Sequence, residues 1–204
     1  TRELAFKRSS NLNIPIPLTS FIGRDSELQE VAELLKNSRL VTLTGSGGVG
    51  KTRLAIQVAA EVLERFPDGV WFLDLAPITE PTLVPTALAN LLRLRESGDL
   101  SDAELLVNYF RSGTALIIVD NCEHLIDACA QLIHLLLTSC ENVSILATSR
   151  EALHVSGETS YRVPSLEVPS LEKEFAMDHL VNIESIQLFI QRASSISPAF
   201  KLVP

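Results

Sequence analysis

The feature that constrains this chain most is a glycine-rich segment, Gly45–Thr52, with the sequence G-S-G-G-V-G-K-T. It fits the pattern G-x-x-x-x-G-K-[ST], in which glycines let the backbone curl so that its N–H groups point at phosphate oxygens. The strand-like run Leu40–Thr44 precedes it, and a helical pattern follows from about Gly50 to Phe66. The positive end of that helix would face the same anion. The segment therefore predicts a phosphate-binding loop between a strand and a helix.

Two side chains of this loop have expected roles of their own. Lys51 would neutralise the β- and γ-phosphates of a nucleotide, and the Thr52 hydroxyl would ligate Mg²⁺. The alternative is a glycine-rich turn with an exposed lysine, which a match placed between a strand and a helix disfavours. The residues of this region expected to contact the nucleotide are Gly45, Ser46, Gly47, Gly48, Val49, Gly50, Lys51, Thr52 and Arg53.

Strand and helix patterns alternate along the chain. Short apolar runs predict strands, and apolar faces at helical spacing predict helices. This alternation predicts right-handed βαβ crossovers and an α/β fold, a mostly parallel sheet flanked by helices, with ligands beyond the carboxyl ends of the strands. The expected strands are Leu40–Thr44, Val70–Leu75, Ala115–Asp120, Val143–Thr148 and, at an edge, Thr159–Val163. The expected helices start near Asp25, Gly50, Pro81, Ser101, Glu123 and Glu184, and Ser101-Asp102-Ala103-Glu104 has the spacing of a capping box.

Three charged residues follow expected strands. Asp120 ends a buried apolar run, where it could hold Mg²⁺ directly or through water. Glu123 could polarise an attacking water as a general base, but it could equally be an acid favoured at the start of a helix. Arg150 could reach the γ-phosphate and report hydrolysis, or it could be an exposed arginine that pairs with Glu151.

The segment before the first expected helix has two interpretations. Phe21-Ile22-Gly23-Arg24 reads, on composition alone, as a hydrophobic staple at the entry to a helix. Alternatively, Phe21 and Ile22 could cover a base, with Arg24 near the ribose or a phosphate. Residues 1–18 are polar or proline-rich, which favours an extended backbone without hydrogen-bonded structure. We therefore expect residues 1–18 to be a linker from an upstream domain.

Composition narrows the class of protein. The chain has 204 residues, 46% hydrophobic and 21% charged, which is a globular composition that excludes a disordered tail or a fibre. A formal net charge of −8 disfavours direct binding of nucleic acid by this segment. No apolar run approaches the roughly 18 residues of a membrane span. The three cysteines, Cys122, Cys129 and Cys140, read as reduced structural thiols of a cytoplasmic protein.

Absent motifs point to the nucleotide. The chain lacks the N-K-x-D motif of guanine-specific GTPases and the L-S-G-G-Q motif of ABC ATPases, so ATP is the expected nucleotide. Three functional hypotheses follow: a regulatory ATP/ADP switch, a metabolic P-loop kinase or ATPase whose turnover is the function, and an interaction scaffold with a degenerate site.

Four segments in sequence order resemble the nucleotide-binding domain of STAND ATPases, the NB-ARC-like signalling NTPases. They are F-I-G-R-D-S-E-L, L-V-T-L-T-G-S-G-G-V-G-K-T-R-L-A, A-L-I-I-V-D-N-C-E-H-L and I-L-A-T-S-R-E-A-L. The likeness runs from about Leu18 to Ala193 and is greatest to bacterial ATP-binding transcriptional regulators. It implies a P-loop NTPase domain over residues 19–165, with a five-stranded parallel sheet and the phosphate-loop strand near its centre. Residues 166–204 would begin a truncated helical domain.

The resemblance also implies roles for residues. Gly45–Thr52 would be the Walker A loop, Asp120 the Walker B acid that holds magnesium, Arg150 the first sensor arginine, and Phe21–Arg24 the motif that packs on adenine. The resemblance further implies a switch in which ADP locks a closed monomer and ATP permits self-association of the full-length protein. Slow Mg²⁺-dependent hydrolysis would return the protein to the closed form. An effector domain would belong to the same polypeptide. Asn121 stands where many relatives have a second acid, a departure that points to weak hydrolysis.

Overall fold

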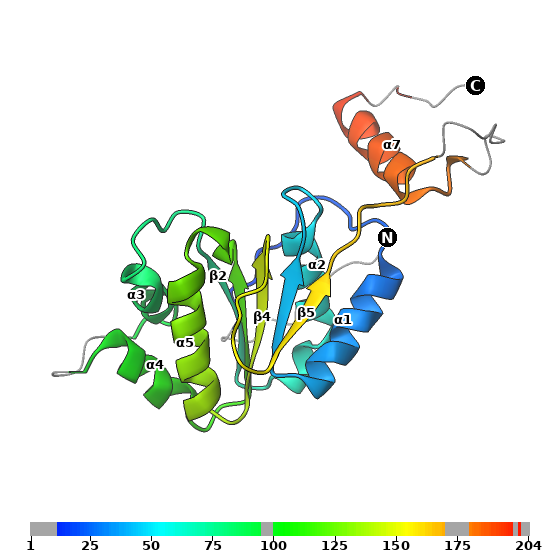
Figure 1. The fold of residues 1–204 in the computed structure, drawn as a ribbon. Coiled ribbons are helices and arrows are strands. Elements are labelled where there is room, and N and C mark those ends of the chain that lie inside the picture. Colours follow the sequence, from blue (N-terminus) through cyan, green and yellow to red (C-terminus); the bar gives the residue numbers. More distant parts are fainter. Residues whose placement is uncertain (1–11, 95–99, 170–179, 198–199, 201–204) are drawn as a thin grey trace.

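Five strands form one parallel sheet in the computed structural model, which describes residues 12–94, 100–169, 180–197 and 200 (Figure 1). The strands are β1 (Leu40–Thr44), β2 (Gly69–Asp74), β3 (Ala115–Asp120), β4 (Val143–Ser149) and β5 (Glu158–Arg162). Their spatial order is β2-β3-β4-β1-β5. The expected strands and the parallel α/β sheet are confirmed. The expectation that the phosphate-loop strand lies near the centre is also confirmed, because β1 pairs with the middle strand, β4, on one side and with β5 on the other.

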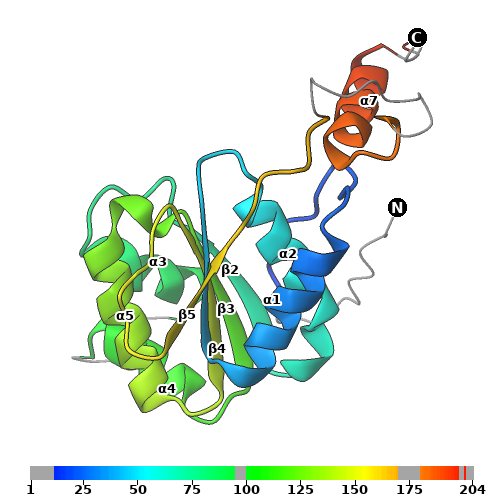
Figure 2. The ribbon, with the colours of Figure 1, turned by 45° about the vertical axis from the view of Figure 1, so that its right-hand side comes forward.

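Helices cover both faces of the sheet. On one face lie α1 (Asp25–Asn37) and α2 (Lys51–Glu61), and on the other α3 (Leu83–Leu91), α4 (Asp102–Phe110) and α5 (Ile126–Ser139) (Figures 1 and 2). The last helix, α7 (Glu184–Ile196), stands apart from both layers, beyond the carboxyl ends of the strands. In the described part of the chain, no helix is both long and apolar enough to cross a membrane.

Two expected helices are interrupted by short 3-10 turns. The helix expected to reach Phe66 ends at Glu61, and a 3-10 turn, η1 (Leu63–Arg65), follows. Phe66 precedes Pro67 and is therefore disfavoured in helical conformation, so the helix could not have included Phe66 as expected. The helix expected from Glu123 begins instead at Ile126, after the 3-10 turn η2 (Cys122–His124).

The sheet has a hydrophobic core on each of its two faces, and alternate residues of a strand belong to one or the other. All six residues of β3 are buried. Ile117 and Val119 pack in the cluster formed with α3, α4 and α5, whereas Leu116 and Ile118 pack in the cluster formed with α1 and α2. Successive side chains of a strand point to opposite faces, so a strand covered on both sides must be apolar throughout. The continuous apolar run before Asp120 follows from this position between two helical layers.

Two local expectations are confirmed. The Ser101 backbone N–H donates to Glu104 Oε2 at 2.8 Å and the Glu104 N–H donates to Ser101 Oγ at 3.4 Å, which is the expected capping box. Cys122, Cys129 and Cys140 are buried free thiols. The structure thus carries no disulfide between these three cysteines.

Residues 12–14 of the expected linker contact the edge of the sheet, whereas residues 1–11 lie outside the described residues. Leu12 forms a parallel bridge with Val70 of β2, and Ile14 is buried. The Asn13 amide donates to the Phe72 carbonyl oxygen at 2.9 Å and accepts from the Phe72 N–H at 2.6 Å. The expectation of a segment without hydrogen-bonded structure is therefore wrong for residues 12–14. Because β2 is an edge strand with unpaired polar groups, an amide side chain that offers both a donor and an acceptor can pair with it.

Candidate functional site

The glycine-rich segment forms a loop, residues 45–52, that joins the carboxyl end of β1 to the first turn of α2. Gly48 and Gly50 have φ angles of 80° and 97°, and a Cβ atom at either position would meet no atom within 4 Å. Glycine is required at these two positions by the backbone conformation and not by lack of space. The open space beside the loop is where a phosphate chain would lie.

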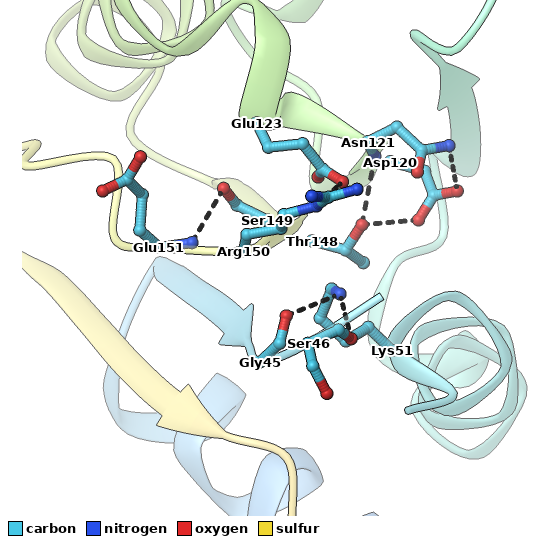
Figure 3. A network of polar contacts seen from close by, with 10 residues as sticks. All are labelled: Gly45, Ser46, Lys51, Asp120, Asn121, Glu123, Thr148, Ser149, Arg150 and Glu151. Carbon is cyan, nitrogen blue, oxygen red and sulfur yellow. Dashed lines mark hydrogen bonds and ion pairs between the residues drawn. The ribbon is translucent and has the colours of Figure 1, made fainter. Parts of the chain in front are cut away.

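Lys51 is buried across this phosphate loop. Its ammonium group donates to the carbonyl oxygens of Gly45 at 2.9 Å and Ser46 at 3.0 Å, and only 8% of the residue is exposed (Figure 3). Among the described residues it has no carboxylate within ion-pair distance. A buried charge without a counter-charge is unfavourable, so this arrangement favours an anion as the missing partner.

Asp120 at the end of β3 meets Thr52 at the end of the phosphate loop. The Thr52 hydroxyl lies 2.8 Å from Oδ1 and 3.0 Å from Oδ2 of Asp120, and the Thr148 hydroxyl of β4 donates to Oδ1 at 2.6 Å. Burial raises the pKa of the Asp120 carboxyl, and the hydrogen bonds from Thr148 and Thr52 partly oppose that rise. The structure thus brings together the two side chains that the sequence assigns to magnesium.

This oxygen pair fits Mg²⁺ held mainly by its nucleotide. Mg²⁺ commonly takes one or two protein oxygens and completes its octahedral shell with waters and substrate phosphates. Within the described ranges, no cluster of three or more His, Cys, Asp and Glu side chains could hold a metal. One hydroxyl and one carboxylate beside a phosphate loop are therefore the donor set expected for magnesium that arrives with a nucleotide.

Asn121 lies between two carboxylates. Its backbone is left-handed, with φ of 63°, and its side-chain amide donates to Asp120 Oδ2 at 3.1 Å and to Asp74 Oδ1 at 3.2 Å. Asp74 ends β2 directly opposite Asp120 in the strand register. The residue directly after Asp120 is thus a neutral hydrogen-bond donor and not a second acid.

Arg150 extends over the phosphate loop and forms an ion pair with Glu123. Figure 3 shows Arg150 beside Glu123, with Arg150 Nε 3.2 Å from Glu123 Oε1. A Cβ atom on Gly47 would lie 3.8 Å from Arg150 Nη2. Arg150 is exposed and paired with an acid, as the alternative reading expected, but the acid is Glu123 and not Glu151. The Glu123 Oε2 atom is buried and has no hydrogen-bond partner among the described residues. The 3-10 turn η2 places Glu123 where it meets the arginine.

Arg24 is a buried cross-link. It is only 4% exposed, and its Nη2 atom donates to the carbonyl oxygens of Val49 at 2.8 Å and Pro164 at 2.9 Å. Its backbone N–H donates to Glu184 Oε1 at 2.9 Å. Arg24 therefore ties the phosphate loop to the chain that leaves β5 and to the first residue of α7. Sequence reasoning considered only a ribose or phosphate contact for this side chain.

A cavity of about 560 Å³ lies beside the phosphate loop and α7. It brings together the loop, the segment before α1, Arg53 and residues that the sequence prediction missed. The missed residues are Ser20, Ser165, Leu166, Val168, Ser185, Leu188 and Arg192. Three of them, Ser185, Leu188 and Arg192, lie in the helix that the sequence predicted from Glu184, but that pattern indicated only the start of a helical domain and no ligand contact. Arg150 instead lines a separate hollow of about 320 Å³ with Arg162, on the β5 side of the loop.

Two proteins related by sequence cover most of this chain. An uncharacterised protein of Mycobacterium tuberculosis is 40% identical over 185 residues, which cover 91% of this chain and 44% of that protein. A second M. tuberculosis protein, named provisionally as an HTH-type transcriptional regulator, is 42% identical over 169 residues, which cover 83% of this chain and 18% of that protein. The chain thus spans less than half the length of these relatives.

Solved structures and a family model complete the comparison. A STAND protein of Pyrococcus horikoshii with a tetratricopeptide repeat sensor has a TM-score of 0.51 at 20% identity, covering 72% of this chain and 24% of that one. Cdc6p of Pyrobaculum aerophilum has a TM-score of 0.55 at 16% identity, covering 90% and 52%. At these identities the likeness shows the fold alone, that of a P-loop NTPase. The NB-ARC domain model matches residues 24–185, and the chain therefore belongs to the NB-ARC domain family.

Proposed function

We propose that this domain binds ADP or ATP with Mg²⁺ and serves as the nucleotide-dependent switch of a larger regulatory protein. The observation that carries the proposal is the buried Lys51 ammonium, which lies across the phosphate loop without a carboxylate partner among the described residues. A nucleotide supplies the missing negative charge, and the loop supplies backbone N–H groups for its oxygens.

Each part of the nucleotide has a matching part of the site. Residues 45–51 bind the β- and γ-phosphates, and Thr52 and Asp120 hold Mg²⁺, which neutralises charge on those phosphates. Phe21 and Ile22 form an apolar wall of the cavity, and Leu188 of α7 forms another. Two apolar walls suit a stacked base, and the absence of the guanine-specific motif favours adenine.

Hydrolysis is proposed to be slow. A water-activating acid must be free to reach the water near the γ-phosphate, but Arg150 holds Glu123 in an ion pair. Asn121 supplies no second carboxylate, because its side chain is an amide, and this amide donates to Asp120 and Asp74. ATP is thereby retained long enough to report a state, and Arg150 is released from Glu123 when it turns to the γ-phosphate.

The two relatives from M. tuberculosis support an effector domain in the same polypeptide. Both relatives are at least twice as long as this chain, and one of them is named as a transcriptional regulator. We propose that residues 19–165 form the nucleotide-binding domain and that residues 166–204 begin a helical domain. We also propose that the ATP form of the full-length protein self-associates in the cytoplasm, and that this segment does not itself bind nucleic acid.

Single-turnover hydrolysis separates the switch from a catalytic ATPase. The protein is mixed with limiting radiolabelled ATP and Mg²⁺, and the fraction of ADP is followed with time. The proposal predicts turnover well below the ~1–100 s⁻¹ of metabolic kinases, with ADP retained afterwards. Rapid steady-state release of ADP, or phosphoryl transfer to a small acceptor, would contradict the switch and favour the metabolic alternative.

A further inference from the structure

Two arginines from distant parts of the chain share one hydroxyl group at the cavity. Arg53 Nη1, from the first turn of α2, donates to Thr19 Oγ1 at 2.7 Å, and Arg192 Nη2, from α7, donates to the same atom at 3.0 Å. Arg53 is held further by the carbonyl oxygens of Thr19 and Ser20, each at 2.8 Å. One side-chain oxygen with two lone pairs thus positions two cations.

The charges of these two guanidinium groups are not balanced within the described residues. Within the described part of the chain, neither guanidinium forms an ion pair with a carboxylate. Burial, together with the charge of Arg192, lowers the pKa of Arg53. Both side chains line the cavity that also contains the phosphate loop. Like charges held together at the wall of a cavity favour an anionic ligand there.

We propose that Arg192, paired with Arg53 on the Thr19 hydroxyl, binds the ribose and α-phosphate end of the nucleotide. This inference rests on the proposed function, since it assigns a ligand contact within the same site. Lys51 and the loop serve the outer phosphates, whereas the arginine pair lies beside the apolar residues before α1 that suit the base. Guanidinium groups offer several N–H donors in a fixed plane, which suits phosphate and hydroxyl oxygens together.

Because Arg192 belongs to α7, this proposal gives α7 a direct contact with the nucleotide. This helix has no buried residue, and it stands apart from the sheet and its helical layers (Figures 1 and 2). Its described hydrogen bonds to the rest of the domain come from Glu184, which accepts from the Arg24 N–H, and from Arg192. A nucleotide held by Arg192 therefore fixes the position of α7 relative to the phosphate loop.

Calorimetric titration of the 204-residue chain tests the assignment. MgADP and Mg-pyrophosphate are each titrated into the wild-type protein, Arg192→Ala and the charge-matched control Arg111→Ala. We expect Arg192→Ala to weaken MgADP binding by roughly 10-fold or more, the loss typical of a charged hydrogen bond, and pyrophosphate binding by less than about threefold. Arg111→Ala should change neither.

The outcomes separate the inference from the proposed function. Wild-type protein that binds neither ligand contradicts the proposed function itself. Wild-type binding of MgADP with an unchanged affinity in Arg192→Ala overturns the inference, and so do equal losses for ADP and pyrophosphate, which would indicate a general charge effect. Arg192→Gln keeps an amide donor for Thr19 and removes the charge, so it replaces Arg192→Ala if thermal unfolding shows that the alanine variant is not folded.

Discussion

Arg24→Ala should destabilise the domain even when no nucleotide is present. The guanidinium is almost fully buried and donates to the carbonyl oxygens of Val49 and Pro164. A hydrogen bond to a charged group contributes about 1.5–3 kcal/mol, so two at the lower end contribute about 3 kcal/mol. For a chain of this size each kcal/mol corresponds to about 2–4 °C, so the midpoint of thermal unfolding should fall by about 6–12 °C.

The assay is thermal and urea unfolding of nucleotide-free protein, followed by circular dichroism. Arg24→Lys should recover part of the loss, because one ammonium group cannot reproduce the fixed fork of a guanidinium between two carbonyls. Arg111→Ala is the control, since Arg111 is the exposed C-cap residue of α4 and its side chain donates to Asn108 of that helix. Unchanged stability of nucleotide-free Arg24→Ala, combined with weaker nucleotide binding, would refute the cross-link and favour a direct ligand contact.

Two further predictions concern Asp120 and Asn13. Burial raises the pKa of Asp120 above its ordinary value of 3.8, so without Mg²⁺ its contribution to the free energy of unfolding falls as pH rises from 3.8 through the raised pKa. Asp120→Asn should remove that fall in urea unfolding measured from pH 3.8 upward, and an equally steep fall in the variant would contradict it. Asn13→Ala should cost about 2 kcal/mol, since it removes two hydrogen bonds to β2, whereas the exposed Asn37→Ala should cost less than about 0.5 kcal/mol. Equal losses for the two asparagine variants would show that Asn13 does not stabilise the sheet edge.

Local patterns predicted the sheet and the phosphate loop. The run Ala115–Asp120 is buried on both faces, and this forces the apolar residues that made it recognisable as a strand. The carboxyl ends of parallel strands lie at one edge of the sheet. The loop that follows β1, and the start of α2 with Thr52, therefore lie at the same edge as Asp120 at the end of β3. The contact between Thr52 and Asp120 depends on the strands running in the same direction, and the alternation of strands and helices in the sequence predicts that direction.

The cross-links between distant segments could not be predicted. Glu184 binds the Arg24 N–H across 160 positions of sequence, and Arg192 binds Thr19 across 173. No local propensity describes such pairs, because each depends on where α7 stands after the chain leaves β5. The Arg150 partner was misjudged for the same reason: Glu151 is adjacent in sequence, but the 3-10 turn η2 brings Glu123 to the guanidinium.

The central claim is tested most directly by calorimetric titration of MgADP into the wild-type chain and into Lys51→Ala. The account predicts a one-to-one complex for the wild type, weaker binding of MgGDP, and a loss of at least about 10-fold in MgADP affinity when the buried ammonium group is removed. The account is contradicted if folded wild-type protein gives no heat with adenine nucleotides at millimolar concentration, or if Lys51→Ala binds MgADP as tightly as the wild type.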